Sequence, residues 1–412
     1  MAVVARRCAL VLSIVVLPVW IVAEQGATAP AQGSTGGRGQ GQAQGAAQGT
    51  SFPGGRMSAD GALLPAGPSG GLFSQEAYTQ YEILAPGSEA FAITYLLESA
   101  RAGATEIMNA TRLGSKGENI SVFDPRTGEP VKFTYDQGAN GQYAIRATLP
   151  FPVPEGGIGR VLIYKTYKDG RTYQVNGDNI VWVRSLAGYR LGVVLPKGYA
   201  FTSANVAAQM STTADGRLKL AFASPSGASN NLTIHAHKTA AAFQPSPYTD
   251  MFFDDIKTLY TLDAPETGRI NVEQTYSDTR KGDRATLNAL DYMALTDLKV
   301  IDLDTAKPLA PEKQGKVTTV KLGVPITNDK QSAHLRVTGV INDGSYKLDK
   351  GDLVFDRTLH GLRNTVLLPA GYEVSAVSQS ATIGRTREGR IIVSLINLNG
   401  ENAYKVTIRA RK

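Results

Sequence analysis

A pattern that recurs at a nearly constant spacing constrains the fold of this chain of 412 residues more than any other feature. Three pairs of similar segments lie 173 or 174 positions apart: 184–188 with 357–361, 195–199 with 368–372, and 234–238 with 408–412. Self-similarity at a fixed period indicates repeated structural units. The sequence therefore predicts two homologous units, at 78–238 and 257–412, joined by a connector at 239–256.

Both predicted units consist of short runs rich in Val, Ile, Thr and Tyr, separated by Gly, Pro, Asn and Asp. This punctuation is typical of β-strands joined by turns. The clearest runs are 90–97, 160–167, 171–175, 190–195, 217–222, 232–237, 335–341, 365–368, 390–396 and 404–409. The Asp-Gly turns at 168–170 and 342–344 predict hairpins. The segment 283–296 fits either a helix or a pair of strands.

The fold class that follows is all-β, with two tandem homologous antiparallel β-sandwich units. Each unit has about 160 residues, which suits an immunoglobulin-like sandwich or a larger one. The spacing of the runs does not decide between one large sandwich and two small ones in each unit.

The N-terminus has the pattern of a signal peptide at residues 1–23. Arg6 and Arg7 precede an apolar run from Cys8 to Ala23, and a positive start before a short apolar segment is what such signals require. We expect cleavage after Ala23 and export to the periplasm, the cell surface or the medium. An uncleaved signal that anchors the chain is the alternative. Cleavage removes the only Cys, so the mature chain has no thiol chemistry.

Residues 24–77 are of low complexity, and the part at 33–49 is almost entirely Gly, Gln and Ala. A segment without apolar periodicity cannot bury enough surface to offset its ordering entropy. The sequence predicts a disordered, flexible Gly/Gln-rich linker here.

Charge and motifs exclude several classes of function. The formal net charge of +7 falls to +5 without Arg6 and Arg7, which is too little for a nucleic-acid binder. The chain has no P-loop and no dinucleotide-binding glycine motif, so we expect no cofactor. The stretch at 67–71 matches a nucleophile elbow formally, but it lies in the predicted linker rather than between a strand and a helix. We therefore predict no catalytic residue.

His235 and His237 are the candidates for zinc ligands, while the acidic clusters at 254–255, 302–304 and 343–352 fit turns better than a calcium site. Two residues apart on a strand, the two histidines point to one face, but zinc needs a third ligand. The equivalent positions in the second unit are Arg409 and Arg411, which favours a solvated polar face. We therefore predict no metal site.

The last residues form the candidate binding surface. Seven cations face only two acidic residues between positions 384 and 412: Arg385, Arg387, Arg390, Lys405, Arg409, Arg411 and Lys412. Such an excess suits an anionic partner. An ordinary charged strand edge, which discourages aggregation, is the alternative.

These features predict an exported, non-catalytic β-sandwich protein that serves as a binding, accessory or structural component of the cell envelope. Its expected partner is an envelope protein or an anionic surface, since two similar units enlarge a surface or offer two sites. The alternative is an exported hydrolase acting on polysaccharide or peptide, with its site between the two units.

Overall fold

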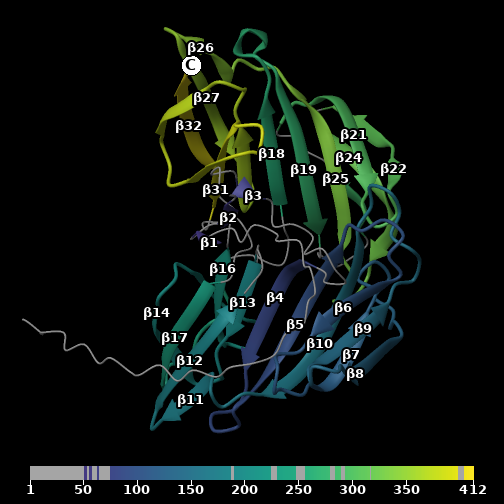
Figure 1. Ribbon diagram of the computed structural model, residues 1–412, viewed down its shortest axis with the longest axis vertical. Helices are drawn as coiled ribbons and strands as arrows, with labels where there is room; N and C mark the ends of the chain where they lie inside the picture. Colours follow the sequence, from purple (N-terminus) through teal and green to yellow (C-terminus); the bar gives the residue numbers. More distant parts are fainter. Residues whose placement is uncertain are drawn as a thin grey trace, which may run out of the picture. The chain divides into compact units, whose positions relative to one another are not determined.

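The computed structural model describes residues 51–52, 55–57, 63–64, 75–186, 190–223, 230–246, 256–278, 284–288, 293–315, 317–397 and 403–412 (Figure 1). Regular structure there is β-sheet, apart from one 3-10 turn at Pro265–Thr267. The all-β prediction is confirmed. Within 283–296, the described residues form strand β20 (Arg284–Asn288) and the start of a further strand, while 289–292 lie outside the described residues.

We call residues 75–246 the first half and residues 256–412 the second half. The first half has one seven-stranded sheet, in which β13 and β4 are parallel and the other neighbours antiparallel. Its order is β15 (Gln209–Thr212), β16 (Leu218–Ala223), β13 (Arg190–Val194), β4 (Gln75–Ile83), β5 (Ala90–Ser99), β10 (Gly159–Lys168) and β7 (Glu118–Phe123).

Two smaller sheets cover this large sheet. The first has the order β11 (Tyr173–Asn176), β12 (Asn179–Leu186), β17 (Asn230–Lys238) and β14 (Tyr199–Ala204), and the second the order β6 (Glu106–Ala110), β9 (Tyr143–Thr148) and β8 (Phe133–Gln137). One apolar core contains side chains of all three sheets, such as Ile163 of the large sheet, Trp182 and Ile145. The arrangement is sandwich-like, with both small sheets packed against one large sheet.

The second half has an eight-stranded sheet, with β18 and β28 parallel. Its order is β22 (Lys307–Leu309), β21 (Thr296–Asp302), β25 (Ala333–Ile341), β19 (Ile270–Asp278), β18 (Ile256–Leu262), β28 (Arg363–Leu367), β31 (Ile391–Ile396) and β30 (Thr382–Arg385). A four-stranded sheet has the order β26 (Tyr346–Asp349), β27 (Asp352–Leu359), β32 (Tyr404–Arg411) and β29 (Glu373–Val377), and a three-stranded sheet contains β20, β24 (Val317–Ile326) and β23 (Pro311–Gln314).

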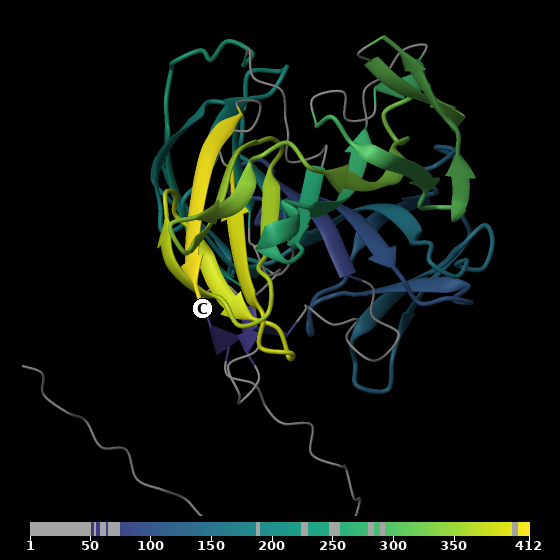
Figure 2. The ribbon, with the colours of Figure 1, turned by 90° about the horizontal axis from the view of Figure 1, so that it is seen from above.

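The second half also builds its core between one large and two small sheets. Val337 of the large sheet, Phe355 of the four-stranded sheet and Val320 of the three-stranded sheet are buried in the same cluster. Figure 2 shows the yellow strands near the C-terminus gathered apart from the green strands of the three-stranded sheet. The two small sheets therefore cover different parts of the large sheet.

The two predicted Asp-Gly hairpins are wrong. The turn at 168–170 leads from β10 to β11, and the turn at 342–344 leads from β25 to β26, which belong to different sheets. The reason is that β10 and β25 already have a partner on each edge, so the next strand cannot pair with them. The hairpin instead follows one strand later, at Lys350-Gly351 between β26 and β27, where both residues have positive φ as a two-residue hairpin turn requires.

The N-terminal predictions concern residues that are mostly not described. The predicted signal peptide at 1–23 lies wholly outside the described residues, and so does most of the predicted linker at 24–77. Its described pieces between 51 and 64 form a small sheet of β1 (Ser51–Phe52), β2 (Gly55–Met57) and β3 (Leu63–Leu64), and residues 75–77 already belong to β4, so the first half begins before the predicted boundary at 78. Among the described residues, no helix has the length and apolar character to span a bilayer.

A buried tyrosine hydroxyl predicts a loss of stability in alkali. Tyr173 donates its hydroxyl proton to the carbonyl oxygen of Leu84 at 3.0 Å, and burial, with a smaller contribution from Tyr199, raises its pKa to about 12. Because the folded pKa lies above the usual value of about 10, the stabilisation is complete below pH 10 and is lost as the pH rises towards 12. Denaturant unfolding at pH 9 and pH 11 should show this loss, and Tyr173→Phe should reduce it.

Candidate functional site

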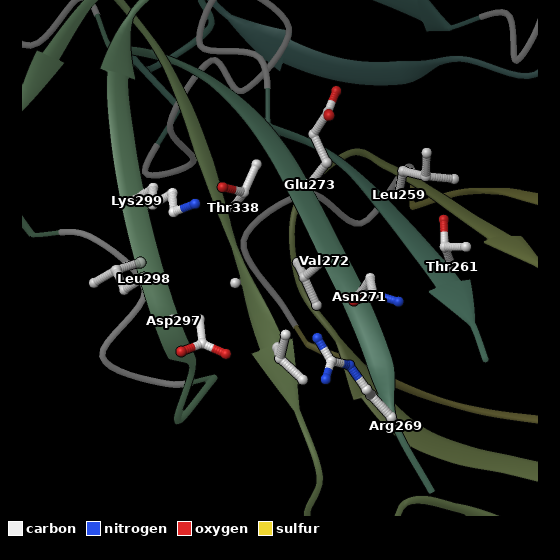
Figure 3. A pocket seen from close by; sticks show the side chains of 12 residues that line it. Leu259, Thr261, Arg269, Asn271, Val272, Glu273, Asp297, Leu298, Lys299 and Thr338 are labelled. Atoms are coloured by element: carbon white, nitrogen blue, oxygen red, sulfur yellow. The ribbon is translucent and has the colours of Figure 1, made fainter. Parts of the chain in front are cut away.

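An open hollow with a volume of about 620 Å³ lies on the large sheet of the second half. Figure 3 shows its lining side chains on the neighbouring strands β18, β19, β25 and β21. The lining residues are Leu259, Thr261, Arg269, Asn271, Val272, Glu273, Asp297, Leu298, Lys299, Thr338, Gly339 and Val340. This volume falls within the range of pockets that bind small molecules.

Strand register explains how the polar lining residues come together. Thr338 of β25 lies directly opposite Lys299 of β21 on one side and Glu273 of β19 on the other. Side chains in directly opposite positions share one face of a sheet. This is the face away from the core, because the alternate residues Val337 and Ile341 are buried. Lys299 and Glu273 are two strands apart, which is about 10 Å.

A β-bulge forms the end of the hollow. Thr296 pairs with Val340 and Lys299 with Thr338, so Asp297 and Leu298 together face the single residue Gly339. Asp297 has a φ of 53°, in the left-handed region, as bulge residues commonly do. A Cβ atom on Gly339 would lie 3.0 Å from the carbonyl oxygen of Thr296, so glycine permits the close approach.

The hollow contains both signs of charge in equal number. Arg269 pairs with Asp263 at 3.4 Å between its Nε and the carboxylate. Among the residues that the structure describes, Glu273, Asp297 and Lys299 form no ion pair and no side-chain hydrogen bond. Figure 3 shows Glu273 and Lys299 towards one end of the hollow and Asp297 and Arg269 towards the other. Glu273, Asp297 and Lys299 are therefore available to a ligand.

The chemistry that the hollow offers is charge and hydrogen bonding. Its polar groups are two carboxylates, two cations, two threonine hydroxyls and one amide. Within the described parts of the chain, no cluster of three or more His, Cys, Asp or Glu side chains is suited to a metal ion. One signal in the sequence points to this place: Gly339 lies inside the predicted strand 335–341, and glycine inside a strand often marks a bulge.

The structure places His235 and His237 on the exposed face of β17, away from the hollow. His237 Nδ1 lies 2.9 Å from the hydroxyl oxygen of Thr202 on β14. Neither histidine belongs to a metal-binding cluster among the described residues.

The seven cations of the candidate basic surface lie on or beside β29 to β32, and most have a partner. Arg385 donates to Glu373 at 2.7 Å, Lys405 pairs with Asp356 at 3.2 Å, and Arg409 pairs with Asp352 at 3.5 Å. Arg411 also donates to Asp352, and this hydrogen bond is the main reason that the pKa of Asp352 lies below its usual value.

The remaining three cations have local contacts. Arg390 donates through Nε to the carbonyl oxygen of Leu368 at 2.8 Å, and the ammonium of Lys412 lies 5.5 Å from the centre of the Tyr372 ring. Arg387 helps to lower the pKa of Glu388, after the hydrogen bonds from Thr386 and the backbone. The carboxylates of Glu373, Asp356 and Asp352, which lie outside the segment 384–412, offset part of the charge excess that the sequence shows.

A buried polar cluster lies where the two halves meet. Arg160 donates from Nε and Nη2 to the two carboxylate oxygens of Asp304, each at 2.6 Å. Its guanidinium also donates to the hydroxyl and the carbonyl oxygen of Ser332, at 2.7 and 2.9 Å. The adjacent cavity, which Asp304 and His334 line, has a volume of about 20 Å³, enough for about one water molecule.

Comparisons with known proteins give no family. No family model matches the chain, and no curated protein matches it. Among solved structures, it is similar to an M1 zinc metallopeptidase from Deinococcus radiodurans, with 15% identity over 47% of this chain and 44% of that chain and a TM-score of 0.29. The chain thus spans less than half the length of that metallopeptidase.

Two further solved structures cover more of the chain at lower identity. A putative protease from Parabacteroides distasonis is 9% identical over 82% of this chain and 93% of that chain, with a TM-score of 0.24. A collagen adhesin from S. aureus is 8% identical over 82% and 97%, with a TM-score of 0.16. At these scores, none of the three supports an assignment of function.

Proposed function

We propose that this protein is an exported, non-catalytic binding protein of the cell envelope, built from two copies of one β-sandwich unit. We propose further that the hollow on the second copy binds an extended peptide that carries both signs of charge. The signal-peptide pattern at 1–23 supports export.

The order of the strands supports the duplication. The large sheets of the two halves have the same strand order. It is β15-β16-β13-β4-β5-β10-β7 in the first half and β30-β31-β28-β18-β19-β25-β21 in the second, where β22 is added at the edge. The four-stranded sheets have the parallel orders β11-β12-β17-β14 and β26-β27-β32-β29. The three-stranded sheets, β6-β9-β8 and β20-β24-β23, also agree. Each pair of neighbouring strands in the first half thus has a counterpart in the second.

Individual contacts support it as well. Tyr173 donates to a carbonyl oxygen at the end of β4, and Tyr346 donates to one at the end of β18. The ring of Trp182 packs on Tyr81 at 5.3 Å between centroids, while Phe355 packs on Tyr260 at 5.8 Å, and both pairs have an interplanar angle of 56°.

The bulge that ends the hollow also has a counterpart. In the first half, β7 shifts register against β10 at Asn119, whose φ is 51°. There the Asn119 amide donates to the hydroxyl oxygen of Thr166 at 3.0 Å. The corresponding pair in the second half is Asp297 and Val340, and valine offers the carboxylate no hydrogen bond.

The observation that carries the proposed function is the difference between the two copies at the hollow. Alignment by strand register places four neutral residues of the first half where the second half has four charged ones. The pairs are Ala90 and Arg269, Thr94 and Glu273, Asn119 and Asp297, and Ser121 and Lys299. Structural needs shared by both copies do not require these charges, which favours a role in binding.

The balance of charge decides the class of ligand. Arg269 is already paired with Asp263, which leaves Glu273 and Asp297 to repel a negatively charged ligand and Lys299 to repel a positively charged one. A peptide with both signs can pair with Lys299 and Glu273 about 10 Å apart. Its backbone groups can bond to the Thr338 and Thr261 hydroxyls and the Asn271 amide. We therefore infer a mixed-charge peptide rather than an acidic or a basic polymer.

The experiment measures binding of labelled synthetic peptides to the full chain by fluorescence anisotropy. The probes are an alternating Lys-Glu peptide and all-Lys and all-Glu peptides of equal length. We expect the alternating peptide to bind best, and Lys299→Glu to weaken its binding about tenfold, the effect of about 1.4 kcal/mol. The double variant K299E/E273K should recover affinity, because the two charges are exchanged.

Arg385→Glu is the matched control, since it reverses a cation of the C-terminal basic set outside the hollow. It should leave binding unchanged. Loss of binding in R385E but not in K299E would place the site on the basic end and contradict the proposal. Failure of the alternating peptide to bind better than the two homopolymers would also contradict it.

A further inference from the structure

The two halves meet through a pair of reciprocal backbone hydrogen bonds. The amide of Ser332 in the second half donates to the carbonyl oxygen of Pro125 in the first, at 2.7 Å. The amide of Ile158 in the first half donates to the carbonyl oxygen of Leu303 in the second, also at 2.7 Å. Strand register aligns Ile158 with Ser332 and Pro125 with Leu303. Each half therefore uses the same two positions, once as donor and once as acceptor.

The acceptor turns of the two halves have the same local structure. In each, the carboxylate of the first residue accepts the backbone N–H two residues later at 2.9 Å: Asp124 from Arg126, and Asp302 from Asp304. The fifth residue of each turn, Gly128 or Ala306, has positive φ. Reciprocal contact between equivalent elements is the mark of an isologous interface, which two-fold symmetric dimers use.

The backbone contacts between the halves are symmetric, but the side chains at the equivalent positions differ. Arg160 binds Asp304, and the equivalent residues on the opposite side are His334 and Arg126, which line the same small cavity. Two copies of the first half would place Arg160 against Arg126 in a desolvated interface. Two like charges in a desolvated interface repel each other strongly, so this pairing is disfavoured. The buried ion pair forms only between a first half and a second half.

Apolar side chains add affinity across the same junction. Leu362 and Ile396 of the second half pack in one cluster with Tyr78, Leu96 and Leu162 of the first half. Leu362 has no exposed surface. No described strand of one half pairs with a strand of the other, so these side-chain and turn contacts, not a shared sheet, join the halves.

We infer that the junction is a pseudo-two-fold interface that holds the two halves together without the covalent connector, and that the Arg160–Asp304 pair makes it selective for one half of each kind. This inference rests on the duplication in the proposed function but not on the peptide site. The surface is thus a docking surface, and the partner that fits it is the complementary half.

The first experiment cuts the folded full chain. A protease site placed in the connector at 247–255 allows cleavage after folding, and size-exclusion chromatography then separates the products at low micromolar concentration. We expect the two fragments to elute together. Elution as two separate folded fragments in native buffer would overturn the inference, whatever the peptide-binding result.

The second experiment tests selectivity with charge variants of the same cleavable chain. Asp304→Arg places two cations together and should release the fragments after cleavage. The double variant R160D/D304R restores an opposite pair and should recover at least part of the co-elution. Glu373→Arg, which disrupts an exposed pair with Arg385, is the matched control and should behave like the parent.

Folding of each uncut variant is checked by circular dichroism. If Asp304→Arg does not fold, Asp304→Asn replaces it, since the amide keeps the shape and removes only the charge. Fragments of the single variant that stay together as tightly as those of the parent would show that the ion pair does not select the partner. If the fragments of both the parent and R160D/D304R separate after cleavage, the proposed interface is contradicted.

Discussion

Replacing Asp304 with alanine is expected to lower the free energy of unfolding by about 3–5 kcal/mol, the usual cost of breaking a buried ion pair from one side. Arg160 and Asp304 are both buried and joined by two hydrogen bonds of 2.6 Å. Burial acts to lower the pKa of Arg160, but Asp304, together with the more distant charges of Glu98 and Asp124, holds that pKa above its ordinary value. Without Asp304, the Arg160 guanidinium stays charged and buried. Among the described residues, it then keeps hydrogen bonds only to Ser332.

The measurement is urea unfolding of the full chain, with the m-value compared between variants. The double variant R160M/D304L removes both charges and keeps apolar volume, so it should cost much less than D304A, because replacing both members of a buried pair is often nearly neutral. A loss below 1 kcal/mol for D304A, or an equal loss in the double variant, would show that the charge pairing is not what stabilises the junction.

Truncating Trp182 to alanine is the second change with a large expected effect, again about 3–5 kcal/mol. Trp182 has no exposed surface, and its ring lies 5.3 Å from Tyr81 and 6.3 Å from Phe91 between centroids. Alanine leaves a cavity that the surrounding sheets cannot close. Thermal or urea unfolding followed by circular dichroism measures the loss.

Two comparisons separate the packing effect from other causes. Trp182→Phe keeps a ring and removes an indole N–H that has no hydrogen-bond partner among the residues that the structure describes, so it should cost clearly less than alanine. Phe355→Ala, at the corresponding position of the second half, should lower the free energy of unfolding by about 3–5 kcal/mol, the usual loss for a buried phenylalanine. A W182A protein as stable as the parent would mean that the ring does not hold the two sheets together.

The basic C-terminal residues follow from the sequence, but their partners and the hollow do not. The basic C-terminal set was found by counting charges, but counting does not reveal partners that lie on other strands. Asp352 and Asp356 on β27 neutralise Arg411 and Lys405 on β32 because the two strands are adjacent in the sheet. The hollow was missed, since Arg269, Asp297 and Thr338 are far apart in the sequence and share no motif. The one local signal is Gly339, a glycine inside a predicted strand.

The sequence by itself determined that the chain is all-β, because alternation of apolar and polar residues and the turn residues between the runs are local properties. It also predicted two similar units from their spacing, which the parallel strand orders support. Tertiary structure alone decided which strands are neighbours: the Asp-Gly turns lead to a new sheet because both edges of β10 and β25 are taken. It alone brought Arg160 to Asp304, 144 positions apart, because a buried charge is stable only beside its partner.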